Sequence, residues 1–275
     1  MRFAINIPNF GSFANPRDIV ALAQEADQAG WDGFFLWDHV LWSDPENYAV
    51  AEPWVTLAAM AQASEHIRIG PMITPLPRRR PWQVARQALT LDHLSNGRAV
   101  LGVGLGGDWF GDYSAFGETT DQRAHGEMLD EALDVLCGLW SGETFHYAGK
   151  HFAINGVQML PIPLQQPRIP LWVAGVWPGT RPFQRAARFD GVAPISKTNQ
   201  PFTPTQIRDM LAYIGQYRTS SAPFDVIIAG GPLQAAEYTA LAEAGVTWYQ
   251  VGFWASDSVD DVRNTIRGGI PATST

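Results

Sequence analysis

Short apolar runs alternate with amphipathic segments along almost the whole chain. Continuous apolar runs are typical of parallel strands that are covered on both faces, whereas strands with one wet face alternate apolar and polar residues. Eight runs predict such strands, at Phe3–Ile7, Gly33–Trp37, Ile67–Ile73, Ala99–Leu105, Ile169–Ala174, Gly191–Ile195, Asp225–Ala229 and Thr247–Phe253.

The segments between these strands carry apolar residues at helical spacing. Pro16–Ala29 begins after Asn15, a good N-cap residue, and ends at Gly30. Similar spacing predicts helices at Trp54–Ala63, Pro81–Leu94, Thr205–Tyr217, Leu233–Ala244 and Val259–Ile266. The repeated strand–helix order predicts an α/β fold, a (β/α)8 TIM barrel. An open doubly wound sheet would need only about six strands and would leave two runs unexplained.

One long segment interrupts this order between the fourth and fifth strands. Residues 106–168 hold a loop rich in glycine and aromatic residues (GGDWFGDYSAFGE), a long helix at about Asp121–Trp140 and a polar ribbon with His146 and His151. We expect the ribbon to form a surface hairpin and neither histidine to bind a metal. We expect a single domain at 1–267 with this insertion, followed by a flexible tail at 268–275.

Composition excludes several classes of protein. The 275 residues carry a formal net charge of −8, and Arg78–Arg80 is the only dense basic run, so no nucleic-acid partner is expected. Cys137 is the single cysteine, which excludes an intrachain disulfide and a cysteine metal cage. No apolar stretch reaches the roughly 18 residues that span a bilayer. The start RFAINI does not resemble a signal peptide, so we expect a cytoplasmic protein without a membrane partner.

The stretch GWDGFFLWDHV at Gly30–Val40 carries the first candidate chemistry. Its apolar strand runs straight into Asp38 and His39. The carboxyl ends of parallel strands are where α/β folds place their active sites, and histidine titrates near neutral pH. A catalytic Asp-His pair is one interpretation, and a barrel-mouth histidine held by a neighbouring carbonyl is the other. His125, near the start of the long helix, is a weaker candidate.

Glycines follow two other predicted strands. The fourth ends in GVGLGGD, with Gly104, Gly106 and Gly107, and the fifth ends in AGVWPGT, which leads into a short helical stretch. Glycines there let a ligand approach the backbone, and free N–H groups at a helix start suit a phosphate. Each could be an ordinary turn, but two on neighbouring strands favour a bound cofactor. GVGLGG lacks the full dinucleotide fingerprint, which excludes a Rossmann site.

Several segments together resemble the bacterial luciferase-like superfamily. The segments are INIPNFG, GWDGFFLWDH, ARQALTLDHLSNGRAVLGVGLG, LWSGETFHYAGKHF and PLQQPRIPLWVAG, and they cover nearly the whole chain in order. Members of this superfamily are flavin- or deazaflavin-dependent oxidoreductases built on a (β/α)8 barrel. The fold that the resemblance implies agrees with the fold that the apolar pattern predicts.

The resemblance also implies roles for particular residues. His39 would be the catalytic acid or base, and Asp38 would orient its imidazole and raise its pKa. Trp177 departs from the small residues usual in the phosphate loop. No metal site is implied. The implied cofactor-binding residues, which share positions at the ends of strands, are Asn6, Asp38, His39, Ile73, Thr74, Gly104, Gly106, Gly107, Gly175, Val176, Trp177, Gly179 and Thr180.

Two cofactors are used by relatives of this kind, FMN and the deazaflavin coenzyme F420. The sequence WDH before Val40 favours F420, with hydride transfer to or from a small organic substrate. An FMN-dependent two-component monooxygenase, supplied with reduced flavin by a partner reductase, is the alternative. A non-catalytic flavin-binding relative is the second alternative.

Aromatic residues are dense in Leu41–Tyr48 and Asp108–Phe116. They predict a lid over an apolar or aromatic substrate, with an oligomer interface or ordinary core as the alternative. Arg79 and Arg80 would meet an acidic cofactor tail or substrate, or would form a solvated pair. The resemblance implies a homo-oligomer, most simply a dimer.

Overall fold

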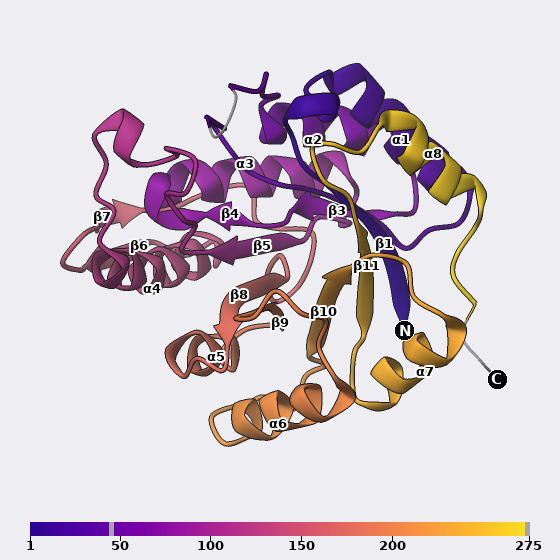
Figure 1. Ribbon diagram of the computed structural model, residues 1–275. Coiled ribbons are helices and arrows are strands. Elements are labelled where there is room, and N and C mark those ends of the chain that lie inside the picture. Colours follow the sequence, from indigo (N-terminus) through magenta and orange to yellow (C-terminus); the bar gives the residue numbers. More distant parts are fainter. Residues whose placement is uncertain (44–46, 273–275) are drawn as a thin grey trace.

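Parallel strands form a barrel-like sheet in the computed structural model, which describes residues 1–43 and 47–272 (Figure 1). Neighbours in the sheet follow the order β3-β2-β1-β11-β10-β9-β8-β5-β4. A bridge between Ile69 and Ala99 links β3 to the chain before β5 and brings the ends of the sheet together. The strands are β1 (Arg2–Ile7), β2 (Gly33–Leu36), β3 (Arg68–Pro71), β4 (Thr74–Pro75), β5 (Leu101–Gly104), β8 (Leu171–Trp177), β9 (Gly191–Ser196), β10 (Asp225–Gly230) and β11 (Trp248–Gly252).

The structure confirms the predicted α/β barrel with small changes at the ends of elements. The expected third strand, Ile67–Ile73, corresponds to β3, a second short strand, β4, begins directly after the predicted end, and the peptide between Met72 and Ile73 is cis. β3 pairs with β2, whereas β4 pairs with β5. The two short strands therefore act together as the third strand of the barrel.

Helices follow the strands around the outside of the barrel. Asn15 caps the first of them by accepting a hydrogen bond from the N–H of Arg17, as the sequence predicts. The helices are α1 (Pro16–Gln28), α2 (Pro53–Ala63), α3 (Pro81–Leu94), α4 (Gln122–Leu139), α5 (Arg181–Ala186), α6 (Pro204–Gly215), α7 (Ala235–Glu243) and α8 (Val259–Arg267), with 3-10 turns η1 (Gly11–Phe13), η2 (Leu76–Arg78) and η3 (Ser114–Phe116).

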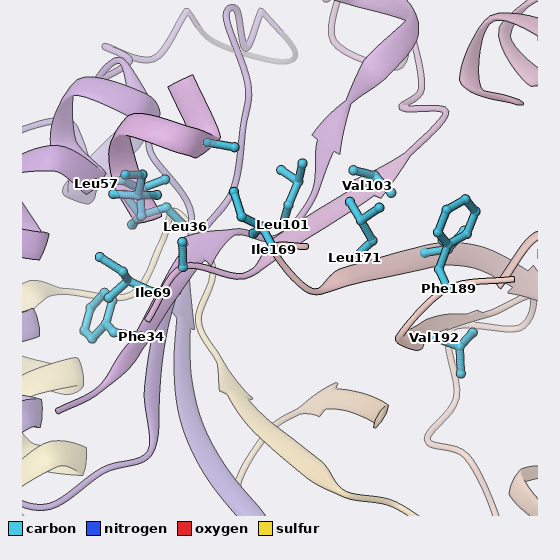
Figure 2. Packing of buried hydrophobic residues seen from close by; sticks show 14 of the residues in the cluster. Phe34, Leu36, Leu57, Ile69, Leu101, Val103, Ile169, Leu171, Phe189 and Val192 are labelled. Carbon is cyan, nitrogen blue, oxygen red and sulfur yellow. The ribbon is translucent and has the colours of Figure 1, made fainter. Parts of the chain in front are cut away.

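The main hydrophobic core lies between the strands and the helices. Figure 2 shows part of it, with Leu36, Ile69 and Leu171 from three strands and Leu57 from α2. The opposite faces of the strands point into the barrel, because side chains alternate along a strand. These faces form a second cluster: Ala4, Phe35, Met72, Val100, Trp172, Ile227 and Trp248.

The insertion between β5 and β8 forms the expected hairpin. β6 (Phe145–Ala148) pairs antiparallel with β7 (Ala153–Val157) and lies beside α4 (Figure 1). Residues 44–46 of the predicted aromatic segment and residues 273–275 of the predicted flexible tail lie outside the described residues. No helix within the described ranges is both long enough and apolar enough to cross a membrane.

Candidate active site

The strand ends that the sequence selects lie on the same rim of the barrel. All neighbouring barrel strands are parallel, so their carboxyl ends point the same way. Asn6 lies near the end of β1, and His39 follows β2 on the neighbouring strand. The glycines after β5 and β8 lie on that rim too, because β5 pairs directly with β8.

His39 is fixed by two residues from other parts of the chain. Its Nδ1 lies 2.5 Å from Oδ2 of Asp112, a residue of the insertion. The side-chain amide of Asn9 donates to the carbonyl of His39 at 2.8 Å, and the N–H of His39 donates to Oδ1 of Asn9 at 3.2 Å. The imidazole is 21% exposed and Asp112 only 3%, so the ring is accessible in part whereas its carboxylate partner is buried.

Asp38 does not orient His39, which corrects the role expected from the sequence. The buried carboxylate of Asp38 accepts hydrogen bonds from Arg78 at 2.8 Å, Arg79 at 2.7 Å, Thr74 at 2.8 Å and the Trp54 indole at 3.2 Å. None of these partners is His39, whose imidazole is bonded to Asp112 instead. Asp38 is therefore bound within the wall of the barrel.

Arg78 connects the two carboxylates of the site. Its guanidinium donates to Asp112 at 2.7 Å, and to the side chain and carbonyl of Asp38 at 2.8 and 2.7 Å. The N–H groups of Val40 and Leu41 also donate to Asp112. Burial opposes ionisation of Asp112, but its bond to His39 and the nearby charge of Arg78 hold its pKa below the usual range.

This network also settles the position of Arg79. The sequence left open whether Arg79 meets an acidic cofactor tail or belongs to a solvated pair, and the structure places it against Asp38 and near Glu52, at 3.8 Å. Neighbouring opposite charges in a partly buried setting hold one another in place more effectively than on an open surface. Arg79 is therefore part of the wall that supports the His39 loop.

Aromatic rings surround the imidazole of His39. The centroids of the rings of Phe10, Trp37, Trp42 and Phe110 lie 5.2 to 6.1 Å from its own. Trp42 is stacked between Phe110, at 3.4 Å, and Phe10, at 4.0 Å. Phe110 comes from the insertion, so the predicted aromatic loop does approach the mouth of the barrel.

The wall formed by β4 and β5 has little room for side chains. A Cβ at Gly104 would collide with Cδ1 of Ile73, and a Cβ at Gly107 would collide with the Trp109 indole. Gly106 has φ +70°, a conformation that favours glycine. Thr74 is fully buried and donates its hydroxyl to Asp38, so its side chain faces away from the mouth.

The loop after β8 is folded tightly around a cis peptide between Trp177 and Pro178. A Cβ at Gly175 would collide with Pro182, and the N–H of Gly179 donates to the carbonyl of Val176 at 2.9 Å. Val176 lies on the inward face and is 46% exposed. Thr180 leads into α5 without capping it through its side chain.

The side chain of Trp177 packs against neighbouring helices. Its indole packs edge-on against Phe183 of α5, with centroids 4.9 Å apart, and lies near Tyr213 of α6. Trp177 follows the inward-facing Val176, so it points toward the helices by strand alternation. The unusual tryptophan therefore belongs to the packing between strand and helices.

The weaker candidate His125 lies in the packed interior of the insertion. His125 is buried, with Nε2 2.6 Å from the carbonyl of Thr119 and its ring 4.3 Å from that of Tyr113. These contacts hold the insertion loop against the start of α4. Among residues 1–43 and 47–272, no three histidine, cysteine, aspartate or glutamate side chains are grouped as metal ligands would be.

Three residues of the mouth were missed at the sequence level: Arg78, Asp112 and Gln250. Arg78 belongs to the basic run, and Asp112 belongs to the aromatic loop, but neither position indicates its partner. Gln250 offered a clear signal, because it is a polar residue inside an apolar run. Fully buried side-chain amides are uncommon unless they are hydrogen-bonded.

Comparison with known proteins identifies the family of this chain. Residues 1–268 match the family model of luciferase-like monooxygenases. The chain is 28% identical over 167 residues to the oxygenase component of flavin-dependent trigonelline monooxygenase from Acinetobacter baylyi, covering 60% of this chain and 45% of that protein. It is 32% identical over 162 residues to F420-dependent hydroxymycolic acid dehydrogenase from Mycobacterium tuberculosis, covering 58% and 44%. The aligned part thus spans less than half of either relative.

A solved structure agrees with the whole fold. An F420-dependent secondary alcohol dehydrogenase in complex with an F420–acetone adduct is similar over 100% of this chain and 99% of that one, with a TM-score of 0.81. Its sequence identity is 18%, so the likeness concerns the fold.

Proposed function

This chain belongs to the luciferase-like monooxygenase family, and we propose that it transfers hydride between coenzyme F420 and a small organic substrate. His39 is the residue that exchanges a proton with the substrate. The single observation that carries the proposal is the contact of 2.5 Å between Nδ1 of His39 and Asp112 at the mouth of the barrel. This contact fixes which nitrogen of the imidazole is left for chemistry.

The residues at the mouth fit a planar cofactor. The inward-facing positions near the rim include Gly104, Ala229 and Gly252, which have little or no side chain, and Val176 and Ile195, which are 46% and 48% exposed. These small or exposed apolar residues lie one layer above the aromatic cluster that fills the barrel interior, and they would form the surface on which a ring rests. Ile73, packed over Gly104, would form the wall behind the ring.

The loop after β8 would hold the phosphate end of the cofactor. Gly179 and Thr180 lie where this loop enters α5, and Gly175 lies near the carboxyl end of β8. Phosphates favour the start of a helix because backbone N–H groups of its first turn are not all used within the helix. The N–H of Gly179 is bonded to Val176, so the phosphate would be held by the backbone that follows it. When bound, F420 supplies a ring carbon that accepts or donates hydride.

The chain's own contribution is proton handling. Asp112 accepts the Nδ1–H of His39, so the neutral imidazole keeps its lone pair on Nε2. For oxidation of an alcohol, Nε2 would take the hydroxyl proton while hydride leaves the carbon that bears this hydroxyl. The negative charge of Asp112 stabilises the imidazolium that forms, and Arg78 holds that carboxylate in place. In reduction of a carbonyl, the proton passes in the opposite direction.

The aromatic rings around His39 suit an apolar substrate. Trp37 and Trp254 lie edge to face, with centroids 5.4 Å apart, and Trp254 is 64% exposed. Such rings bury apolar area and keep water from the reacting atoms, which strengthens electrostatic interactions there. The expected substrate is therefore an apolar alcohol or carbonyl compound.

Two observations support F420 rather than FMN. The strand end WDH is the first, and the second is the match to an F420-dependent dehydrogenase. The match to the oxygenase component of a flavin-dependent monooxygenase supports the other candidate, an FMN-dependent monooxygenase.

Cofactor binding tests the proposal directly. Purified protein is titrated with F420 and with FMN, and quenching of cofactor fluorescence gives a Kd for each. We expect micromolar binding of F420, weaker binding of FMN, and F420 reduction without oxygen when a secondary alcohol is added. Binding of FMN alone would replace the proposal with the monooxygenase, and binding of neither would indicate a non-catalytic relative.

A further inference from the structure

Three buried polar atoms inside the barrel have no hydrogen-bond partner in the described part of the chain. They are Oδ1 of Asn6, Nε2 of Gln250 and Nε1 of Trp248. Asn6 is 5% exposed, and Gln250 and Trp248 are 0% and 1% exposed. Burying a polar atom without a partner costs free energy, so native proteins leave few of them.

The three side chains come from neighbouring strands and share one face. β1 pairs with β11, and Trp248 belongs to the cluster inside the barrel. Gln250 is two residues further toward the mouth and Asn6 is two residues beyond Ala4 of the same cluster, so both amides also point inward. The Asn6 amide N–H donates to Oε1 of Gln250 at 2.9 Å. The two amides thus form one polar unit above the aromatic layer.

The inward positions beside this unit and next toward the mouth are small residues on β10 and β11. Gly252 is the next inward position on β11, and a Cβ there would meet only backbone atoms of Gly230 at 3.8 Å or more. Ala229 pairs with Gln250 in the sheet and is exposed. A flat ring that descends along β10 and β11 therefore meets bare backbone and a methyl group before it reaches the amides.

The hydrogen-bonding capacity of the unit does not depend on which way the amides are turned. If both amides are rotated by half a turn, Gln250 donates to Asn6 and the pair again leaves one donor and one acceptor free. The Trp248 indole adds a donor, since its Nε1–H cannot accept. The set of two donors and one acceptor complements a cyclic imide, which presents two C=O groups and one N–H.

We propose that Asn6, Gln250 and Trp248 bind the N–H and C=O edge of a cyclic imide or lactam in the barrel. This inference rests on the proposed function, because it places the ligand in the same mouth. Two sources carry that chemistry: the pyrimidine ring of the flavin or deazaflavin cofactor, and a lactam or imide substrate.

Methylation of the ring nitrogen tests the proposal without any variant. The protein is titrated with lumiflavin and 3-methyllumiflavin, and separately with 2-quinolone and N-methyl-2-quinolone, using quenching of tryptophan fluorescence. Loss of one hydrogen bond and the added methyl clash should weaken binding about tenfold or more. A loss confined to the flavin pair assigns the edge to the cofactor, and a loss confined to the quinolone pair assigns it to the substrate.

Variants then locate the effect. In Asn6→Leu and in Gln250→Leu, the methylated and unmethylated ligands should bind within threefold of one another. Gln216→Leu, an exposed glutamine at the end of α6, is the matched control and should keep the full difference. Circular dichroism checks that each variant is folded. If one of the two barrel variants fails to fold, comparison of the other with Gln216→Leu still tests the proposal.

Two results would overturn the inference. Equal binding of both ligand pairs by the unmodified protein would mean that the three atoms serve internal water or structure only. A tenfold difference that persists in both Leu variants would place the edge elsewhere. Failure of F420 and FMN to bind would end the proposed function but leave the quinolone arm informative, so the two failures can be told apart.

Discussion

The imidazole of His39 and the carboxylate of Asp112 meet at 2.5 Å although 73 residues separate them in the chain. His39 follows β2, whereas Asp112 belongs to the loop inserted after β5. The insertion therefore completes the candidate site. It supplies the anion that orients the imidazole, together with Phe110 on the aromatic wall.

Replacement of His39 tests its role as acid or base. His39→Ala should lower kcat by about 10²–10⁴-fold, the range that general acid–base catalysis contributes, while the Kd of the cofactor changes little. His66→Ala is a suitable control, because His66 is 79% exposed and precedes β3 at the other end of the barrel. A kcat within twofold of the unmodified protein would remove His39 from the mechanism.

Asp112 should act through His39 rather than on the substrate. Asp112→Asn should lower kcat on the order of 10²-fold with little change in KM, because the amide no longer stabilises a charged imidazole. The double variant with His39→Ala should be no slower than His39→Ala alone, since the two residues act as a unit. Asp108→Asn, in the same loop, is the control: it shows how much of the loss in kcat comes from disruption of the loop alone. Additive losses would contradict the pairing.

Arg78 should be important for stability. It is 8% exposed and pairs with two carboxylates that are themselves buried, so Arg78→Met leaves Asp38 with Arg79 alone as a cationic partner and Asp112 without any arginine. The expected loss is about 3–5 kcal/mol in the free energy of unfolding, measured with urea. Arg123→Met should cost at most about 0.5 kcal/mol, because Arg123 is 80% exposed in a pair along α4. A loss below about 1 kcal/mol at Arg78 would show that the network relaxes without it.

The low pKa of Asp112 predicts a specific loss of stability in acid. Burial opposes its ionisation, but the His39 bond and the charges of His39 and Arg78 lower its pKa below the ordinary value of 3.8. A group with a lower pKa in the folded state stabilises the fold above the unfolded value, and that contribution disappears as pH falls through the folded value. The free energy of unfolding, measured with urea from neutral pH to below 3.8, should therefore fall more steeply for the unmodified protein than for Asp112→Asn. Parallel curves would show that Asp112 is not the group responsible.

The hairpin of the insertion depends on Glu131 of α4. Its carboxylate accepts the backbone N–H groups of Lys150, His151 and Phe152 at 2.8 to 2.9 Å. Glu131→Gln should destabilise the hairpin by about 1–3 kcal/mol. Amide hydrogen exchange at the three N–H groups should become faster. Glu143→Gln, at an exposed position before β6, should leave exchange unchanged, and equal exchange in both variants would contradict the role of Glu131.

The barrel was predictable because its determinants are local. Parallel strands buried on both faces require continuous apolar runs, and the amphipathic helices between them require a 3.6-residue period, so the sequence displays both. The cap at Asn15 and the hairpin at residues 145–157 follow from equally local signals. The break between β3 and β4 at Met72 was not predicted, because the run Ile67–Ile73 is apolar apart from Arg68 and was assigned to one strand.

The apolar pattern and the positions of the polar residues and glycines were enough to predict the barrel and the rim on which His39, the glycines after β5 and those after β8 lie. The tertiary structure decided the partners: Asp112 rather than Asp38 for His39, Arg78 between the carboxylates, and Gln250 for Asn6. The physical reason is that these partners are far apart in the sequence, so no local pattern indicates them. Closure of the barrel and folding of the insertion bring distant residues within hydrogen-bonding distance.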